Sequence, residues 1–210
     1  VLYGGLASKL LKINKTVYYM SGLGAIFTYH TSLGRLKAAI VTKLYKFIMR
    51  STSTEVIVEN DDDKNIFTSV IGLTETQVHL IPGVGVDMDQ FFPANHKFSG
   101  KLRVALVCRL LYDKGILEFV EAAKLCKRTR PEVEFLLVGD TDPTNPASVN
   151  QKDLKNIHKD NIVELLGHSM DVASLMKTFD ILVLPSYREG FPKVIIEAAA
   201  SGIPVVTTDV

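Results

Sequence analysis

The stretch ILVLPSYREGFPKVIIEAAASGIPVVT, residues 181–207, decides the fold class of this chain. It begins with an apolar run of strand length at 181–185. It continues through 194–200 as a buried helix, which Gly202 and Pro204 end. A further apolar run then reads as the next strand. A strand, a helix and a strand in this order predict a parallel sheet covered by helices.

Two glutamates lie where the first of these strands gives way to its helix. Glu189 falls in the connecting loop, and Glu197 lies a little over one turn into the helix, whose first turn suits Pro192. Both therefore stand at the carboxyl end of a strand, where open α/β sheets bind their ligands. The free N–H groups of the helix start favour a phosphate between them. This layout predicts a ligand that carries hydroxyl groups on both sides of a diphosphate, as a nucleotide-sugar does.

Two cations form a second candidate constellation. Arg109 and Lys114 follow the first strand of the later half of the chain, in a loop before a helix whose start is marked by Gly115. The fork of an arginine and the point charge of a lysine both suit a diphosphate. A transferase that works without a metal needs such cations, because the leaving nucleoside diphosphate gains negative charge in the transition state.

Both constellations also have plainer explanations. In the first alternative, Glu189 is a solvated loop residue and Glu197 lies on the solvent-exposed face of its helix. In the second, Lys114 pairs with its neighbour Asp113. Against the first alternative, Glu197 interrupts an otherwise apolar helix, where an unpaired buried carboxylate is costly. Against the second, the cations and the glutamates follow two different strands of one predicted sheet.

The same residues carry a resemblance to a known family. The segment EGFPKVIIEA, residues 189–198, resembles the signature of the retaining glycosyltransferases of family four, the group 1 transferases of the GT-B fold. The resemblance extends back through Arg109-Leu110, Asp113-Lys114-Gly115 and Gly139, and it covers residues 102–210. A weaker likeness covers residues 1–95.

The resemblance implies roles for the donor side of a site. Glu197 would hold the ribose hydroxyls of the nucleotide. Glu189, with the backbone of Gly190 and Phe191, would face the donor sugar, and Pro192 belongs to the same segment. Arg109 and Lys114 would join Glu189 as catalytic residues.

Further positions resemble the family less specifically. Gly167 and His168 resemble the loop that contacts the base, although a surface histidine explains His168 without the family. Ser21 and Gly22 occupy the acceptor-side motif in which many members have His-Gly, so the role of that histidine is not carried over. The family usually has glycine where this chain has Cys108, which predicts a less close approach of the backbone to the ligand.

The implied activity is a retaining hexosyl transfer from a nucleotide-sugar. UDP is the commonest nucleotide in the family, and the bond formed is α-glycosidic. The acceptor is a saccharide or a polyprenyl-linked saccharide, as in bacterial polysaccharide synthesis, and no metal or other cofactor is implied. Two alternatives stay open: a nucleotide-sugar 2-epimerase of the same fold, and a nucleotide-sugar-binding remnant without turnover.

Alternating helix and strand patterns predict an α/β chain of two Rossmann-like domains, both incomplete. Residues 1–96 are the remainder of an N-terminal acceptor-side domain with a hinge, and residues 97–210 are the C-terminal nucleotide-sugar-binding domain. Family members are longer, so we expect an internal fragment. The other predicted elements are helices at 2–11, 31–49, 61–70, 116–127 and 172–177, and strands at 16–20, 55–58, 78–81, 103–108, 134–138 and 162–166.

Charge is divided unevenly along the chain. Residues 1–54 hold eight of the 24 Lys and Arg residues and none of the 23 acids. Within them, residues 33–50 read as a basic amphipathic helix, which predicts peripheral contact with an anionic membrane surface. The alternative is an ordinary domain helix with a solvated basic face. Nucleic acid is not expected, because the later half is acidic and carries no recognition motif.

The cysteines and histidines indicate neither a disulfide nor a metal site. Cys108 and Cys126 lack close spacing, and the five histidines are scattered. We therefore expect buried free thiols in a reducing compartment. No run reaches the roughly 18 apolar residues of a spanning helix. Together these features predict a cytoplasmic protein at the inner face of a membrane.

Overall fold

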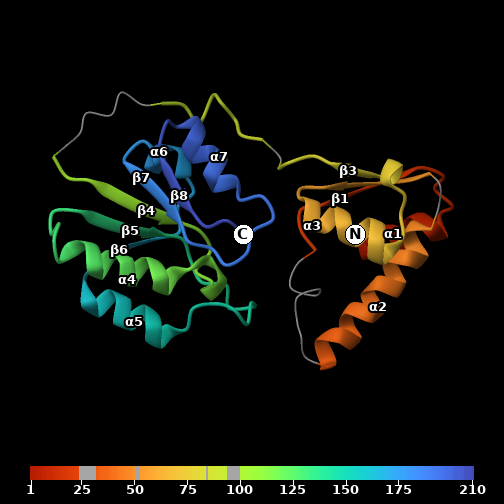
Figure 1. The fold of residues 1–210 in the computed structure, drawn as a ribbon, viewed down its shortest axis with the longest axis horizontal. Coiled ribbons are helices and arrows are strands. Elements are labelled where there is room, and N and C mark those ends of the chain that lie inside the picture. Colours follow the sequence, from red (N-terminus) through yellow and green to blue (C-terminus); the bar gives the residue numbers. More distant parts are fainter. Residues whose placement is uncertain (24–31, 51–52, 84, 94–99) are drawn as a thin grey trace. The chain divides into compact units, whose positions relative to one another are not determined.

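The computed structural model describes residues 1–23, 32–50, 53–83, 85–93 and 100–210. Contacts divide the chain into two compact units, Val1–Val84 and Gly85–Val210, and each is built around a parallel sheet (Figure 1). The α/β fold class predicted from the sequence is therefore confirmed. Among the described helices, none combines the length and the apolar character needed to cross a bilayer.

The first unit is a three-stranded parallel sheet with helices packed on one face. Its strands are β1 (Thr16–Met20), β2 (Thr54–Val58) and β3 (Val78–Leu80), in the order β1-β2-β3. Its helices are α1 (Leu2–Leu10), α2 (Ser32–Met49) and α3 (Asp61–Asn65), with a π-helix at Ile66–Ile71 and a 3-10 turn at Glu75–Gln77. Alternate strand residues are buried in one core with side chains of α2 and the π-helix: Tyr18, Met20, Val56, Val58 and Val78.

The helix expected over 61–70 is interrupted at its middle. Asn60 caps its start by accepting the Asp63 N–H at 2.8 Å, as side chains at helix starts do. From Ile66 the turns widen, and the N–H of Gly72 bonds to the carbonyl five residues earlier, that of Phe67, at 3.1 Å. Residues that the sequence predicted as one helix are thus an α turn followed by a π turn.

The second unit is a five-stranded, fully parallel sheet of order β6-β5-β4-β7-β8. Its strands are β4 (Arg103–Val107), β5 (Glu134–Val138), β6 (Val163–Gly167), β7 (Ile181–Leu184) and β8 (Val205–Thr207). Its helices are α4 (Ile116–Lys127), α5 (Gln151–Asp160), α6 (Val172–Met176) and α7 (Lys193–Ala200), with a 3-10 turn at Tyr112–Lys114. The chain leaves β4 toward β6 and then returns to the other side of β4 for β7. The strand order therefore reverses between β4 and β7, which makes that junction the topological switch point.

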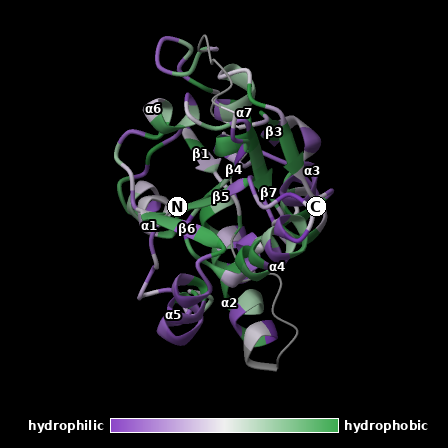
Figure 2. Cartoon of the chain, turned by 90° about the vertical axis from the view of Figure 1, so that its left-hand side faces the viewer, coloured by the Kyte–Doolittle hydropathy of each residue, from purple (hydrophilic) through white to green (hydrophobic). Residues whose placement is uncertain are grey.

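Helices cover both faces of this second sheet. Figure 1 shows α4 and α5 on one side of it and α6 and α7 on the other. Each face has its own apolar core, and Figure 2 shows the strands β5 and β6 as largely hydrophobic. Phe91, from the segment after Gly85, is buried in the core on the α6 and α7 side. Residues 85–93 thus pack with the second unit, whereas the sequence grouped residues up to 96 with the first part.

Helix α5 was not predicted from the sequence. Its apolar stripe is narrow, since Leu154 and Ile157 are the residues of this helix that pack on the core, and Figure 2 colours the rest mainly as hydrophilic. Local capping marks its start instead, because the side chain of Asn150 accepts the Asp153 N–H at 2.9 Å. The hydroxyl of Tyr112 also donates to the Asp153 carboxylate at 2.7 Å, which ties the helix start to the turn after β4.

Gly115 and Gly167 have nearly equal φ angles but differ in their surroundings. Substituting each of them therefore tests how closely the loops pack at the switch point. Gly115 has φ of +72°, and a Cβ there would lie 2.1 Å from the carbonyl oxygen of Pro185. Gly167 has φ of +71°, but a Cβ there would meet nothing within 4 Å. We expect Gly167→Ala to lower the free energy of unfolding by about 1–2 kcal/mol through left-handed strain alone. Gly115→Ala should lower it by about 3 kcal/mol or more, because backbone must also move.

Denaturant unfolding of both variants beside the unsubstituted protein measures this difference. Equal losses for the two substitutions would contradict the close approach of the two loops.

Candidate functional site

An ion pair joins the two loops that meet at the switch point. Lys114 ends the 3-10 turn after β4, Glu189 lies in the loop after β7, and the Nζ and Oε2 atoms are 2.7 Å apart. The two side chains are only 19% and 12% exposed. Lys114 is therefore not paired with its neighbour Asp113, whose buried Oδ1 atom has no hydrogen-bond partner among the described residues. The structure brings together two of the three predicted catalytic residues.

Backbone contacts also join the same two loops. The N–H of Tyr187 donates to the carbonyl of Asp113 at 2.9 Å. The carbonyl oxygen of Pro185 occupies the space that a Cβ atom on Gly115 would need. Because both contacts involve main-chain atoms, the spacing of the loops does not depend on the ion pair alone.

The second carboxylate oxygen of Glu189 is also engaged. Oε1 accepts a hydrogen bond from the Ser186 hydroxyl at 2.6 Å, and Ser186 is 1% exposed. The carbonyl of Ser186 in turn accepts the hydroxyl of Thr208, just after β8. The sequence analysis did not single out Ser186, although a hydroxyl directly after an apolar strand, between Pro185 and Glu189, was a signal for it.

Glu197 lies at the fifth position of α7, which follows Pro192 as its N-cap residue. It is 8% exposed, so it does not lie on a solvated helix face. Its Oε1 atom pairs with Lys193 Nζ at 3.1 Å, one turn earlier, and this partner offsets the burial of its charge. Between the two glutamates, Gly190 is exposed and Phe191 is partly buried.

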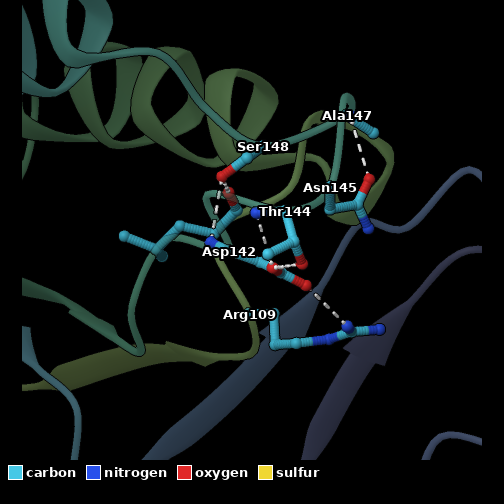
Figure 3. Close-up of polar contacts among 7 residues, drawn as sticks. Arg109, Asp142, Thr144, Asn145, Ala147 and Ser148 are labelled. Atoms are coloured by element: carbon cyan, nitrogen blue, oxygen red, sulfur yellow. Dashed lines mark hydrogen bonds and ion pairs between the residues drawn. The ribbon is translucent and has the colours of Figure 1, made fainter.

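Arg109 faces the loop that follows β5, as Figure 3 shows. One of its guanidinium nitrogens lies 3.3 Å from Asp142 Oδ2. Asp142 Oδ1 accepts from the hydroxyl and the N–H of Thr144 at 2.7 and 3.2 Å, and the Asp142 N–H donates to the Ser148 hydroxyl at 3.0 Å. Chiefly the Thr144 hydroxyl, and to a smaller extent Arg109, hold the pKa of Asp142 below its usual value.

The Arg109 side chain is 65% exposed, so this cation remains open to a ligand. Sequence reasoning missed Asp142. The Asp-Pro-Thr order, which is typical of side-chain-capped turns, was a signal for it.

Cys108 is the first residue after β4 and lies beside the ion pair. Burial raises the pKa of its thiol from 9.0 to about 12. Lys114 opposes the increase, and Glu189 and Asp113 add to it. Gly139 allows the close packing here, since a Cβ on it would lie 1.8 Å from the Cys108 carbonyl oxygen. Cys108 and Cys126 are both free, and both are partly buried against the core of the second unit.

The remaining predicted residues end or follow strands that are not adjacent to the Lys114–Glu189 pair. Gly167 ends β6, where its carbonyl accepts the Gly139 N–H at 2.8 Å, and His168 beside it is exposed. They share the carboxyl edge of the sheet with Glu189 but lie on the far side of β4 and β5. Ser21 and Gly22 follow β1 in the first unit and are exposed. Their acceptor-side role stays a prediction.

Metal binding has no evident site in the part of the chain that the structure describes. There, no three or more His, Cys, Asp or Glu side chains are grouped so that they could hold an ion. Positive charge in the described site comes from the side chains of Lys114, Arg109 and Lys193.

Comparison with known families gives one match over the second unit. Residues 101–210 match the family described as "Glycosyl transferases group 1".

Curated relatives are similar over nearly the whole chain. One is the N,N'-diacetylbacillosaminyl-diphospho-undecaprenol alpha-1,3-N-acetylgalactosaminyltransferase of Campylobacter jejuni, 30% identical over 99% of this chain and 56% of its own length. Another is the UDP-Gal:alpha-D-GlcNAc-diphosphoundecaprenol alpha-1,3-galactosyltransferase of Escherichia coli, 28% identical over 100% of this chain and 55% of its own length. The chain thus spans about half the length of the curated relatives it matches.

Solved structures share the fold. Anabaena HepE in complex with UDP and glucose matches with a TM-score of 0.76 and 22% identity, over 99% of this chain and 56% of that one. WaaG, a glycosyltransferase involved in lipopolysaccharide biosynthesis, matches with a TM-score of 0.73 and 19% identity, over 99% and 63%. The predicted GT-B fold is confirmed by these matches.

The raised pKa of Cys108 predicts a poorly reactive thiol. The thiolate is the nucleophile, so a shift from 9.0 to about 12 lowers the reactive fraction near pH 8 on the order of a thousandfold. We expect iodoacetamide at pH 8 to alkylate Cys108 far more slowly than it alkylates glutathione. Peptide mass mapping over time measures the rate. The same reaction after unfolding in urea is the control, and there Cys108 should react like a free thiol. Alkylation of the folded protein at the glutathione rate would contradict the assigned environment.

Proposed function

The chain belongs to the glycosyl transferases group 1 family, and from this premise we propose that it forms part of a retaining glycosyltransferase. The enzyme moves a sugar from a UDP-sugar to a saccharide or lipid-linked saccharide and forms an α-glycosidic bond. The donor binds at the carboxyl edge of the second unit's sheet, across the junction of β4 and β7. The first unit supplies the acceptor side, and the reaction needs no metal or other cofactor.

The Lys114–Glu189 pair is the observation that carries this proposal. It joins a cation suited to a phosphate and a carboxylate suited to sugar hydroxyls, at 2.7 Å, in loops 75 residues apart. A pair this well buried costs free energy to desolvate, and hydrophobic residues would often serve stability as well. A ligand that needs both charges explains their retention at the point where open α/β sheets bind ligands.

The chemistry of the site follows from the charges around this pair. Lys114 and Arg109 face the diphosphate and stabilise the negative charge that it gains as the glycosidic bond breaks. The N–H groups at the start of α7 add to that stabilisation. Glu197 holds the ribose hydroxyls, and Glu189 faces the sugar. The base lies toward Gly167 and His168.

Two relatives support the choice of donor and acceptor. The name of the Escherichia coli relative gives UDP-Gal and a lipid diphosphate-linked sugar, and that of the Campylobacter jejuni relative gives an undecaprenol-linked acceptor. Both names describe transfer onto lipid-linked saccharides. By analogy, this chain's acceptor is a polyprenyl-linked saccharide at the inner face of a membrane in the cytoplasm.

The surface of α2 supports contact with that membrane. Buried side chains on one face pack in the core of the first unit, yet apolar side chains also recur on the exposed face: Leu36, Ile40, Leu44 and Phe47. Exposed cations stand among them: Arg35, Lys37, Lys43 and Lys46. A helix face that only meets water carries mostly polar residues, whereas these four apolar side chains form one stripe. An apolar stripe flanked by cations is the pattern of helices that lie on anionic bilayers.

Neutralising each glutamate in the full-length protein should impair a different property, UDP binding for one and the catalytic rate for the other. Glu197→Gln should weaken UDP binding, because its ribose contact exists before and during the reaction. Glu189→Gln should lower kcat with UDP affinity nearly intact, because its contact matters as the bond breaks. Each lost charge-assisted hydrogen bond is worth roughly 1.5–3 kcal/mol, about ten- to a hundredfold. Calorimetry with UDP and steady-state product analysis supply both quantities.

Glu121→Gln is the matched control. Glu121 is an exposed residue of α4 paired only with Lys124 in the described surroundings, so the same charge loss there should change neither quantity. Unchanged binding and rate in both site variants would show that the site is wrongly assigned. An epimerised sugar nucleotide as the product, or no turnover of any donor, would exclude the proposed transfer.

Charge reversal on α2 should release the protein from anionic vesicles. We expect Lys43→Glu/Lys46→Glu to reduce binding to phosphatidylglycerol-containing liposomes by at least about tenfold, since each cation near such a surface contributes about 1 kcal/mol. Added salt should weaken the binding of the unsubstituted protein in the same direction. Vesicle sedimentation measures both effects.

Lys152→Glu/Lys155→Glu is the control for net charge. These two exposed lysines lie on α5 of the second unit, so the chain's charge changes equally while α2 is intact. Equal losses for the two double variants, or equal binding of the unsubstituted protein to neutral vesicles, would argue against a membrane-binding α2.

A further inference from the structure

Ser186 is part of the candidate site, and none of the roles proposed above uses it. Its hydroxyl donates to Glu189 Oε1 at 2.6 Å, and the residue is 1% exposed. The bond closes a four-residue segment, 186–189, of the loop after β7. A hydrogen bond to a charged acceptor is shorter and roughly twice as strong as one between neutral groups. This contact therefore restricts where the Glu189 carboxylate can point.

The backbone around Ser186 is held from two sides. Its carbonyl accepts the hydroxyl of Thr208, which follows β8. The next residue, Tyr187, donates its N–H to Asp113 in the loop after β4. One residue before Thr208, the Thr207 hydroxyl donates to the carbonyl of Leu184, the last residue of β7, at 2.9 Å. The position of the Ser186 hydroxyl is thus set by contacts to the segments that follow both neighbouring strands, β4 and β8.

The two oxygens of Glu189 have partners of different kinds. Oε2 lies against the Lys114 ammonium at 2.7 Å, and Oε1 accepts from the neutral Ser186 hydroxyl. A diphosphate carries more charge than a carboxylate and attracts the ammonium strongly, but it gains little from a buried serine hydroxyl. An arriving diphosphate therefore competes for the partner of Oε2 and leaves the partner of Oε1 in place.

We propose that Ser186 is a positioning residue that holds Glu189 through Oε1 while Oε2 exchanges Lys114 for the donor sugar. This inference rests on the proposed function, in which Lys114 binds the diphosphate and Glu189 faces the sugar. In the ligand-free chain, Lys114 and Ser186 together orient the carboxylate. When the donor is bound, Ser186 alone keeps it from rotating, so one oxygen faces the sugar without a reorganisation step.

The test is removal of the hydroxyl in the full-length protein. Ser186→Ala should lower kcat about tenfold, the effect of losing one such hydrogen bond, and leave the Kd for UDP within about twofold. Ser186→Thr, which keeps the hydroxyl, should restore most of the rate. If the alanine variant does not fold, Ser186→Cys takes its place, since a thiol keeps the volume and is a weak donor.

A double variant shows whether Ser186 acts through Glu189. Ser186→Ala/Glu189→Gln should be no slower than Glu189→Gln alone, because the serine then has no carboxylate to orient. Multiplied losses would mean that Ser186 acts independently, and the inference would fall. Ser201→Ala is the matched control. That serine is also buried, its hydroxyl has no partner among the described residues, and its loss should leave kcat unchanged.

The outcomes separate this inference from the proposed function. A slow Glu189→Gln variant beside a fully active Ser186→Ala variant would overturn the positioning role and leave the transferase assignment intact. Full activity in both would overturn the assignment of the site itself. A rate loss in Ser186→Ala matched by Ser201→Ala would mean that any buried hydroxyl matters equally, which also overturns the positioning role.

Discussion

The parallel pairing of β4 with β7 is the constraint on which the second unit depends. Val104 pairs with Ile181 and Ala105 with Leu182, so the two strands end side by side although about 75 residues separate them in the chain. Everything at the switch point follows from this register. The carbonyl of Pro185 meets Gly115 there, and the loop hydrogen bond and the buried ion pair lie above the same junction. A side chain at position 115 would separate the loops, and with them the charges.

Electrostatics gives the junction its chemical character. Removing Lys114 and Glu189 from water costs free energy, which their mutual attraction only partly recovers unless further hydrogen bonds satisfy the remaining atoms. Ser186 supplies one such bond. Nearby, Arg109 stays exposed beside Asp142, whose second oxygen is occupied by Thr144. One cation is thus buried and paired while the other is open, an arrangement in which an anionic ligand can approach Arg109 first.

The two units use their apolar residues differently. In the second unit, apolar strands are covered on both faces, and their sequences read as continuous hydrophobic runs. In the first unit, one face of the sheet holds the core. Val17 and Tyr19, on alternate positions, are 62% and 42% exposed. Its helix α2 likewise has apolar side chains on its inner and outer faces. Large exposed apolar surfaces mark places where soluble proteins meet something else.

Local pattern alone determined much of this protein. Apolar runs with glycine and proline positions located each strand that the structure describes, because periodicity and turn chemistry act within a few residues. They also placed Glu189, Arg109 and Lys114 in segments that follow strands, and Glu197 in the helix after β7. Helix α5 was missed because its apolar stripe consists of two residues, Leu154 and Ile157, on an otherwise polar helix.

Only the tertiary structure determined which side chains of the site pair with one another. Nothing local distinguishes Asp113 from Glu189 as the partner of Lys114. The strand order does, because it places the loop after β7 directly beside the loop after β4. The same holds for Ser186, whose carbonyl accepts a hydrogen bond from Thr208 after β8, and for Asp142, which pairs with Arg109 from the loop after β5. Sequence determines which groups are present at the ends of strands, and long-range pairing determines which of them touch.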